Sequence, residues 1–271
     1  MSDISQSFVK QFEKDVHLAY QQIGSKLKNT VRFKNNIQGA STTFQKVGKG
    51  VATVKSRHGL VPVMNLDHTP IECSLQDFYA GDWVDALDEL KINHDERRVV
   101  ASAGAYALGR KTDDLIIEAL SGATNAVGVY TAALTKDVLL TAFAALNNKD
   151  VPDDGNRYGI VGPLQWNALL NIDEFSSSDY AGDNLPFLKG TEARKWLGIN
   201  WIMHTGLPLD GTERDCFIFH QSAVGHASGC DVKTDISWHG DHASNFVNNM
   251  LSQGSCLIDE DGVIKIKCKE A

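Results

Sequence analysis

The sequence predicts an α+β protein, in which one long helix and several shorter ones share the chain with β-hairpins and single strands. Three observations indicate this class. Apolar residues recur at helical spacing over about 94–120, β-prone residues fill 31–63, and two short β runs lie at 255–258 and 263–268. With 271 residues, of which 42% are hydrophobic, the chain can bury a core without disulfides or a structural metal.

Residues 5–28 are expected to form an amphipathic helix, because apolar side chains recur there every three or four positions. Such a stripe packs either on the protein's own core or on a partner subunit. Phe8 and Phe12 are therefore candidates for contacts between subunits.

Residues 31–63 are expected to form a β-hairpin that turns at Gly48-Lys49-Gly50, between two β-prone runs. The outward side chains are largely Lys, Thr and Gln, and an isolated hairpin with so little apolar surface is only marginally stable. We therefore expect a projecting arm that packs elsewhere, with four candidate inter-subunit residues: Lys46, Lys49, Lys55 and Arg57.

The charge is divided unevenly along the chain. Residues 1–60 hold ten basic and three acidic residues, a net charge of +7, whereas the remainder holds 16 basic and 31 acidic residues, a net charge of -15. The basic segment could bind nucleic acid, or it could lie on the acidic body of a neighbouring copy. A third interpretation is a solvated surface whose halves differ by chance.

The remaining elements follow from local patterns. Asn93 is expected to cap the long helix, with Glu96 completing a capping box. A loop is expected over 172–195, and the closing runs 255–258 and 263–268 are expected to pair as a hairpin through a turn at 259–262. Further helices are expected at 136–147 and 164–170, and further strands at 158–163, 196–203 and 215–220.

Composition excludes several classes of protein. The longest uncharged stretch, 119–135, contains several polar residues, so no membrane-spanning helix is expected. The amino-terminal residues contain no apolar signal core, and we expect a protein that is made and kept in a cytoplasm. The odd number of cysteines, without CxxC spacing, favours reduced thiols over a disulfide framework or zinc site. They are Cys73, Cys216, Cys230, Cys256 and Cys268.

Chemistry-bearing motifs are scarce, and neither a cofactor nor catalysis is expected. The sequence contains no GxGxxG, GxxxxGK[ST], GxSxG or HExxH motif. The best metal-site candidate is His239-Gly-Asp241-His242, since imidazoles and a carboxylate at this spacing can meet one divalent ion. His220 and His226 flank Ser222, but the sequence places no third group that would orient a catalytic base.

The order of these elements resembles the major capsid protein of tailed bacteriophages, which has the Hong Kong 97-type fold. Residues 92–120 resemble its long spine helix, residues 157–170 the strand-then-helix step of its A-domain, and residues 254–267 its closing P-domain hairpin. The resemblance implies the following division: an N-terminal arm (1–30), an E-loop hairpin with its flanks (31–75), a P-domain (76–125 and 231–271, with the spine helix at about 94–120) and an A-domain (126–230).

The resemblance implies a structural protein that self-assembles through pentamers and hexamers into an icosahedral shell enclosing phage double-stranded DNA. We then expect a virion protein assembled in the host cytoplasm, with scaffold, portal and cement proteins as further partners and no membrane contact. No scaffolding region of the family's kind precedes the arm, so scaffolding would come from a separate protein or be unnecessary. Two alternatives stay open: an encapsulin-like nanocompartment shell, and a metal-dependent hydrolase using His239, Asp241 and His242.

Overall fold

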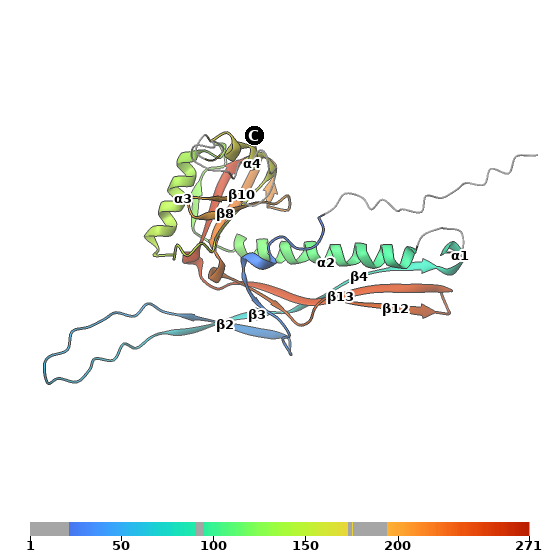
Figure 1. The fold of residues 1–271 in the computed structure, drawn as a ribbon, viewed down its shortest axis with the longest axis horizontal. Coiled ribbons are helices and arrows are strands. Elements are labelled where there is room, and N and C mark those ends of the chain that lie inside the picture. Colours follow the sequence, from blue (N-terminus) through green and yellow to red (C-terminus); the bar gives the residue numbers. More distant parts are fainter. Residues whose placement is uncertain (1–21, 90–94, 173–174, 176–193, 271) are drawn as a thin grey trace, which may run out of the picture. The chain divides into compact units, whose positions relative to one another are not determined.

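The computed structural model describes residues 22–89, 95–172, 175 and 194–270 (Figure 1). The chain divides into two compact units, each built from segments that are distant in the sequence. The first unit comprises residues 1–25, 77–110 and 231–251, and the second comprises 26–76, 111–230 and 252–271. The division into arm, E-loop, P-domain and A-domain stays a prediction.

A seven-stranded sheet organises the second unit. Its order is β5-β14-β10-β6-β8-β7, with β9 also paired to β10. β10 lies at its centre and pairs antiparallel with both β14 and β6, whereas β6 and β8 are parallel. The strands are β5 (Ala126–Gly128), β6 (Arg157–Val161), β7 (Arg194–Trp196), β8 (Ile199–Met203), β9 (Leu209–Asp210), β10 (Glu213–His220) and β14 (Val263–Lys269).

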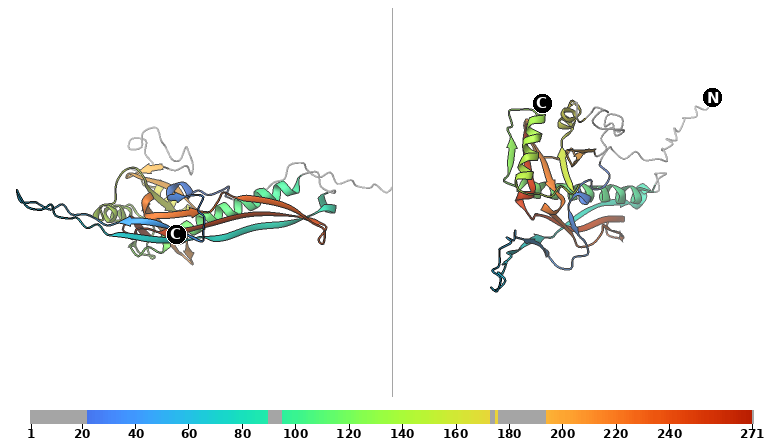
Figure 2. Two further views of the ribbon diagram at one scale, coloured as in Figure 1. Left: turned by 90° about the horizontal axis from the view of Figure 1, so that it is seen from below. Right: turned by 60° about the vertical axis from the view of Figure 1, so that its left-hand side comes forward.

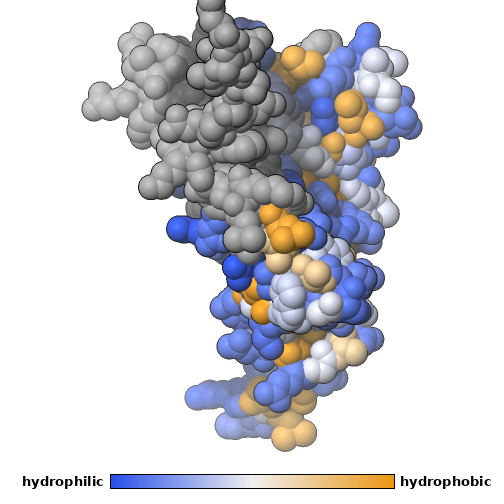
Figure 3. All heavy atoms as spheres, turned by 90° about the vertical axis from the view of Figure 1, so that its right-hand side faces the viewer, coloured by the Kyte–Doolittle hydropathy of each residue, from blue (hydrophilic) through white to orange (hydrophobic). Residues whose placement is uncertain are grey.

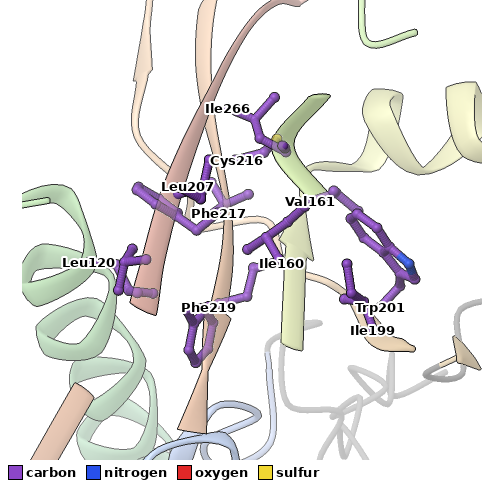
Figure 4. Close-up of a cluster of buried hydrophobic side chains, with 14 of the residues drawn as sticks. Leu120, Ile160, Val161, Ile199, Trp201, Leu207, Cys216, Phe217, Phe219 and Ile266 are labelled. Carbon is purple, nitrogen blue, oxygen red and sulfur yellow. The ribbon is translucent and has the colours of Figure 1, made fainter. Parts of the chain in front are cut away.

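The main hydrophobic core lies on this sheet (Figure 4). The central strand β10 is buried from Cys216 to His220, so its sequence reads as a continuous apolar run rather than an alternating one. The helices that contribute to this core are the carboxyl-terminal part of α2 (Glu96–Ser121), α3 (Lys136–Asn148) and α4 (Pro163–Leu170). These helices lie at the positions that the sequence predicted.

Two further β structures contain the segments around the predicted hairpin. β2 (Ser41–Val47) and β3 (His68–Ser74) form a two-stranded antiparallel sheet. β1 (Arg32–Lys34) instead pairs in parallel with β11 (Val224–Ser228) in a five-stranded sheet ordered β1-β11-β13-β12, in which β4 also pairs with β13. The β2–β3 pair corrects the sequence prediction, because residues 51–55 form no strand and no tight turn closes at Gly48-Lys49-Gly50.

The first unit contains β4 (Gln76–Asp85), α1 (Ala86–Glu89), β12 (Lys233–His239) and the first half of β13 (Ser244–Leu257), besides the amino-terminal part of α2. Gly104 lets α2 approach β13 closely, since a Cβ added at this position would overlap the side-chain amide of Asn249 in β13. The Asn249 amide in turn donates to the carbonyl of Ala80. A buried polar residue therefore joins the helix side of this sheet to β4.

The amino-terminal end of α2 is capped by Asp95, whose carboxylate accepts the amide proton of Arg98 at 3.3 Å. This geometry gives Asp95 the position expected of Asn93, which lies outside the described residues. The helix expected over 5–28 is also corrected in its last part, because residues 22–27 are irregular and only a 3-10 turn, η1 (Lys28–Thr30), follows them. Residues 5–21 lie outside the described part.

The predicted closing hairpin is wrong. β13 pairs with β11 and β12, whereas β14 pairs with β10 and β5 in the seven-stranded sheet. The turn between them contains the 3-10 element η3 (Glu260–Gly262), which is capped by Asp259 through the amide of Asp261. A turn does lie at 259–262, as the sequence predicted, but it connects strands of two different sheets.

Candidate functional site: the loop between β2 and β3

A twenty-residue loop, 48–67, joins β2 to β3 and extends beyond the ends of both strands (Figure 2). Its hydrophobic side chains are solvent-exposed, with Val54 at 97% and Leu60 at 95%. Val51, Val61, Val63 and Met64 are exposed as well. Exposed apolar clusters of this kind mark interaction surfaces in soluble proteins. The described residues also carry single exposed hydrophobic side chains among hydrophilic ones elsewhere, as one face shows (Figure 3).

The charge of the loop is entirely basic between residues 48 and 66. Lys49, Lys55 and Arg57 lie in this stretch, which contains no Asp or Glu. Lys55 and Arg57 are exposed, and the described part of the chain offers neither of them an ion-pair partner. They are therefore available for an acidic surface outside the chain.

The other two predicted contact lysines are engaged within the chain, at the root of the loop. Lys46 Nζ lies 2.8 Å from Asp259 Oδ1, and Lys49 Nζ lies 2.9 Å from Asp150 Oδ2. Lys149 forms a third pair, with Asp261, at 2.7 Å. These pairs are exposed, so each contributes little alone, but together they join the end of β2 to the end of α3 and to η3.

The pKa shifts at the root follow from these pairs. The hydrogen bond and charge of Asp150 raise the pKa of Lys49, and the ammonium of Lys149 lowers the pKa of Asp261. The sequence showed the charge imbalance but not these partners. The turn acids Asp150, Asp259 and Asp261 were missed because each lies about 100 or more residues from its lysine, in a loop without a motif.

A small hydrophobic cluster fixes β2 and β3 below the loop. Phe44, Cys73, Ala227 and Ile258 are buried together. An added Cβ at Gly225 would stand 2.8 Å from the ring of Phe44, so only glycine allows this ring to lie on β11. The root of the loop is thus held by apolar packing beneath and by ion pairs at its edge.

A buried carboxylate of α2 binds the backbone at residues 26–27. Asp113 of α2 is fully buried and accepts the amide protons of Lys26 and Leu27 at 3.0 and 3.1 Å. His204 Nε2 lies 3.0 Å from the same carboxylate, and its Nδ1 accepts from the amide of Gly206. Because Nδ1 is an acceptor, Nε2 carries the proton that His204 donates to Asp113. This arrangement ties the backbone at residues 26–27 to α2 within the second unit.

The candidate metal residues are not brought together into a binding site. His239 ends β12, Asp241 and His242 lie in the following turn, and the carboxylate of Asp241 is 3.6 Å from His242 Nε2 in an exposed position. His239 and His242 both contact the ring of Trp83 instead. Across the residues that the structure describes, no three His, Cys, Asp or Glu side chains are grouped to hold a metal ion.

The structure supplies the third group that the sequence could not place beside His220 and Ser222. Asp154 Oδ1 lies 3.0 Å from His220 Nε2, and His220 Nδ1 lies 2.7 Å from Ser222 Oγ. However, the amide of Ser222 also donates to Nδ1, and Asn156 donates two hydrogen bonds to Asp154, which lower the pKa of Asp154. These bonds cap the 3-10 turn η2 (Gln221–Ala223), so the group holds a turn between β10 and β11.

Phe8 and Phe12, the candidate contacts of the amino-terminal segment, lie outside the described residues. The four basic candidates of the loop stay predictions as inter-subunit contacts. No helix in the described ranges is both long and apolar enough to cross a membrane.

Comparison with known proteins identifies the class to which this fold belongs. The chain aligns with a Mycobacterium phage Che8 structure over 96% of its own length and 97% of that chain, with a TM-score of 0.73 and 19% identity. It aligns with the head structure of Helicobacter pylori bacteriophage KHP40 over 100% and 97%, with a TM-score of 0.76 and 12% identity. A virus-like particle from Pyrococcus furiosus gives a TM-score of 0.58 and 14% identity over 90% and 92%. The fold is thus that of Hong Kong 97-like capsid proteins.

The sequence matches the phage capsid protein family over residues 4–270, and the chain therefore belongs to this family. No curated protein sequence matches it. Membership confirms the resemblance seen in the sequence: this is a capsid protein of the virion that forms a shell by self-assembly, and its family and fold indicate a structural role.

Proposed function

We propose that copies of this chain assemble through pentamers and hexamers into an icosahedral shell that encloses phage double-stranded DNA, without catalysis. The observation that carries the proposal is the 48–67 loop, which is exposed, apolar and basic, and whose root is held by packing and ion pairs. A loop that leaves side chains such as Val54 and Leu60 in water stabilises the protein only once a second copy covers them.

The surface that receives the loop is proposed to be acidic, because Lys55 and Arg57 have no acid nearby in sequence and the chain outside residues 1–60 has a net charge of -15. One acidic hollow of about 440 Å³ is lined by Glu72 and Glu118 in the second unit. Contacts between different faces of identical copies close into rings, as pentamers and hexamers require.

Further parts of the proposal come from the family resemblance. Residues 1–30 act as the arm, 31–75 as the E-loop, 76–125 and 231–271 as the P-domain, and 126–230 as the A-domain at the centre of each ring. Assembly takes place in the host cytoplasm, with scaffold, portal and cement proteins as further partners. The packaged DNA lies against the shell without sequence-specific contacts.

A charge-reversal experiment tests the loop contact. Lys55→Glu/Arg57→Glu should abolish rings and shells in negative-stain electron microscopy while leaving thermal unfolding of the subunit unchanged, since neither side chain has an ion pair among the described residues. The matched control, Lys233→Glu/Lys269→Glu, makes the same change in net charge at two exposed lysines outside the loop. Shells at normal yield from the loop variant would refute the contact. Equal loss in both variants would assign the effect to net charge alone.

The cargo is tested on particles isolated from a lysate. We expect DNA that survives nuclease treatment of intact particles and is digested once they are opened. Particles that contain protein cargo and no protected DNA would instead establish the nanocompartment alternative.

A further inference from the structure

Two of the five cysteines meet where the β2–β3 sheet lies on the five-stranded sheet. Cys73 of β3 is 1% exposed, and Cys256 of β13 is half-buried against the same small cluster that contains Phe44. Cys256 packs against the cluster that contains Cys73, and each thiol is the principal influence on the pKa of the other. They belong to sheets that share no strand, so no backbone ladder connects them.

The backbones around the two cysteines are also in direct contact. A Cβ added at Gly254 would overlap the carbonyl oxygen of Ser74, the residue after Cys73. Cys256 follows Gly254 by two positions and therefore lies on the same side of β13. Its register partner on β11 is Gly225, the residue that makes room for Phe44. The proximity of the thiols thus follows from two close approaches that only glycine permits.

The pair is polarised and open to solvent on one side. Cys256 lines a hollow of about 440 Å³ together with Glu72, Ser74 and Gly122, whereas Cys73 is buried, so a small oxidant approaches the pair from the side of Cys256. The hydrogen bond from Cys256, assisted by the charge of Lys34, lowers the pKa of Cys73. The same contact raises the pKa of Cys256. Cys73 is therefore the member that forms a thiolate, and Cys256 is the proton donor beside it.

We propose that Cys73 and Cys256 are a redox pair that closes to an intrachain disulfide on exposure to a peroxide, tying β3 to β13 at the root of the 48–67 loop. The Cys73 thiolate attacks one peroxide oxygen, the O–O bond breaks, and hydroxide leaves, which yields a sulfenic acid. The Cys256 sulfur then attacks the Cys73 sulfur. The S–S bond forms as the S–O bond breaks, and the departing hydroxide takes the proton of Cys256 to leave as water. Two thiols and one hydrogen peroxide thus give one disulfide and two waters.

The remaining cysteines provide internal controls. Cys216 and Cys268 lie with their sulfurs 3.9 Å apart, but both are buried on adjacent strands of the main sheet, which already share a ladder. A bond between them would connect nothing new. Cys230 is exposed and reports the general reactivity of a surface thiol in the same sample.

A disulfide at the root of the loop would act in the same way whichever cargo the shell holds. Thiols stay reduced in a cytoplasm and oxidise outside it. The loop root would therefore be held by ion pairs and packing during assembly and by a covalent bond after release.

The experiment maps disulfides in the full-length protein before and after hydrogen peroxide. Free thiols are blocked with N-ethylmaleimide under denaturing conditions, and the digest is analysed by mass spectrometry. We expect a peptide that joins Cys73 to Cys256 after oxidation, two hydrogen atoms lighter than the two free peptides and cleaved by dithiothreitol. Cys216 and Cys268 should remain alkylated. The oxidised protein should melt several degrees higher than the reduced protein.

Variants and one contrary result complete the test. In Cys256→Ser, oxidant should leave Cys73 as a sulfenic or higher acid, with no linked peptide and no rise in melting temperature, whereas Cys268→Ser should leave the linkage intact. Full alkylation of Cys73 and Cys256 in peroxide-treated wild-type protein, at a dose that oxidises Cys230, would overturn the proposal. A linkage of either cysteine to Cys230 at the same yield would overturn it as well.

Discussion

Glu270 forms a largely buried ion pair with Arg214, and removing the charge of Glu270 should destabilise the second unit. Its Oε2 lies 2.6 Å from Arg214 Nε and its Oε1 lies 2.7 Å from Arg214 Nη2, so the contact is bidentate. Arg214 also donates to the carbonyl of Leu207, and Gln165 donates to Glu270. The side chains of Arg214 and Glu270 are only 7% and 18% exposed. The substitution Glu270→Gln keeps the shape of the side chain and removes its charge.

The magnitude follows from what the substitution leaves behind. Arg214 stays protonated in a site where water reaches little of it, and breaking one side of a buried pair costs about 3–5 kcal/mol. Because Glu270 is partly exposed and Gln retains one acceptor, we expect the lower end, about 3 kcal/mol. At about 2–4 °C per kcal/mol for a chain of this size, the Tm should fall by about 6–12 °C.

The assay is chemical and thermal unfolding of the purified subunit, followed by circular dichroism. Lys149→Gln is the control, because the exposed pair that it breaks should cost no more than about 1 kcal/mol. The pair also predicts a pH dependence: Arg214 lowers the pKa of Glu270, so the stability that it contributes is present above the unfolded-state pKa and is lost as the pH falls through the folded-state pKa. A Glu270→Gln variant within about 0.5 kcal/mol of the parent would refute the reasoning.

Three further predictions use the same unfolding assays. Asp113→Ala should cost about 3 kcal/mol because the buried amide of Leu27, the partly buried amide of Lys26 and a buried histidine lose their acceptor, whereas Asp114→Ala, its exposed neighbour, should cost less than about 0.5 kcal/mol. Burial lowers the pKa of His226 to about 4, so between pH 6.5 and 4 the unfolded chain binds a proton that the folded chain does not, and the free energy of unfolding should decline by up to about 3 kcal/mol. His226→Gln should remove this decline. The same decline in the variant would contradict the assignment to His226. Gly225→Ala should cost about 1–3 kcal/mol by displacing Phe44, and Phe44→Leu should cost less in that background than alone if the two residues compete for one space.

Local patterns in the sequence were sufficient to locate three helices, although not for the helix expected over 5–28, whose described end is irregular. The apolar spacing located α2, α3 and α4 to within a few residues, because helix formation depends on neighbours three and four positions apart. The strand that precedes α4 was located equally well, since its apolar run ends at Gly162-Pro163. The order of these elements was also enough to recognise the family.

The loop shows where local patterns end. Charge and β propensity predicted a basic projection within residues 31–63, and the structure contains one at 48–67. They could not predict that the partner of β2 is β3 rather than residues 51–55, because two candidate runs of similar propensity differ only in what they pack against. The aliphatic residues of the loop likewise favoured a strand in the sequence, whereas in the structure they form no strand and pair with no other strand.

The sequence by itself determined the fold class, the helices α2, α3 and α4, the basic character of residues 1–60 and the family. Only the tertiary structure decided which groups meet: Lys46 with Asp259, which are 213 positions apart, Arg214 with Glu270, Asp113 with the amides at 26 and 27, and Cys73 with Cys256. The same reason explains the misassigned closing hairpin, in which a correct turn joins strands of two different sheets. Periodicity reports the environment of neighbouring residues, whereas sheet pairing and buried polar contacts depend on backbone paths that the whole chain sets together.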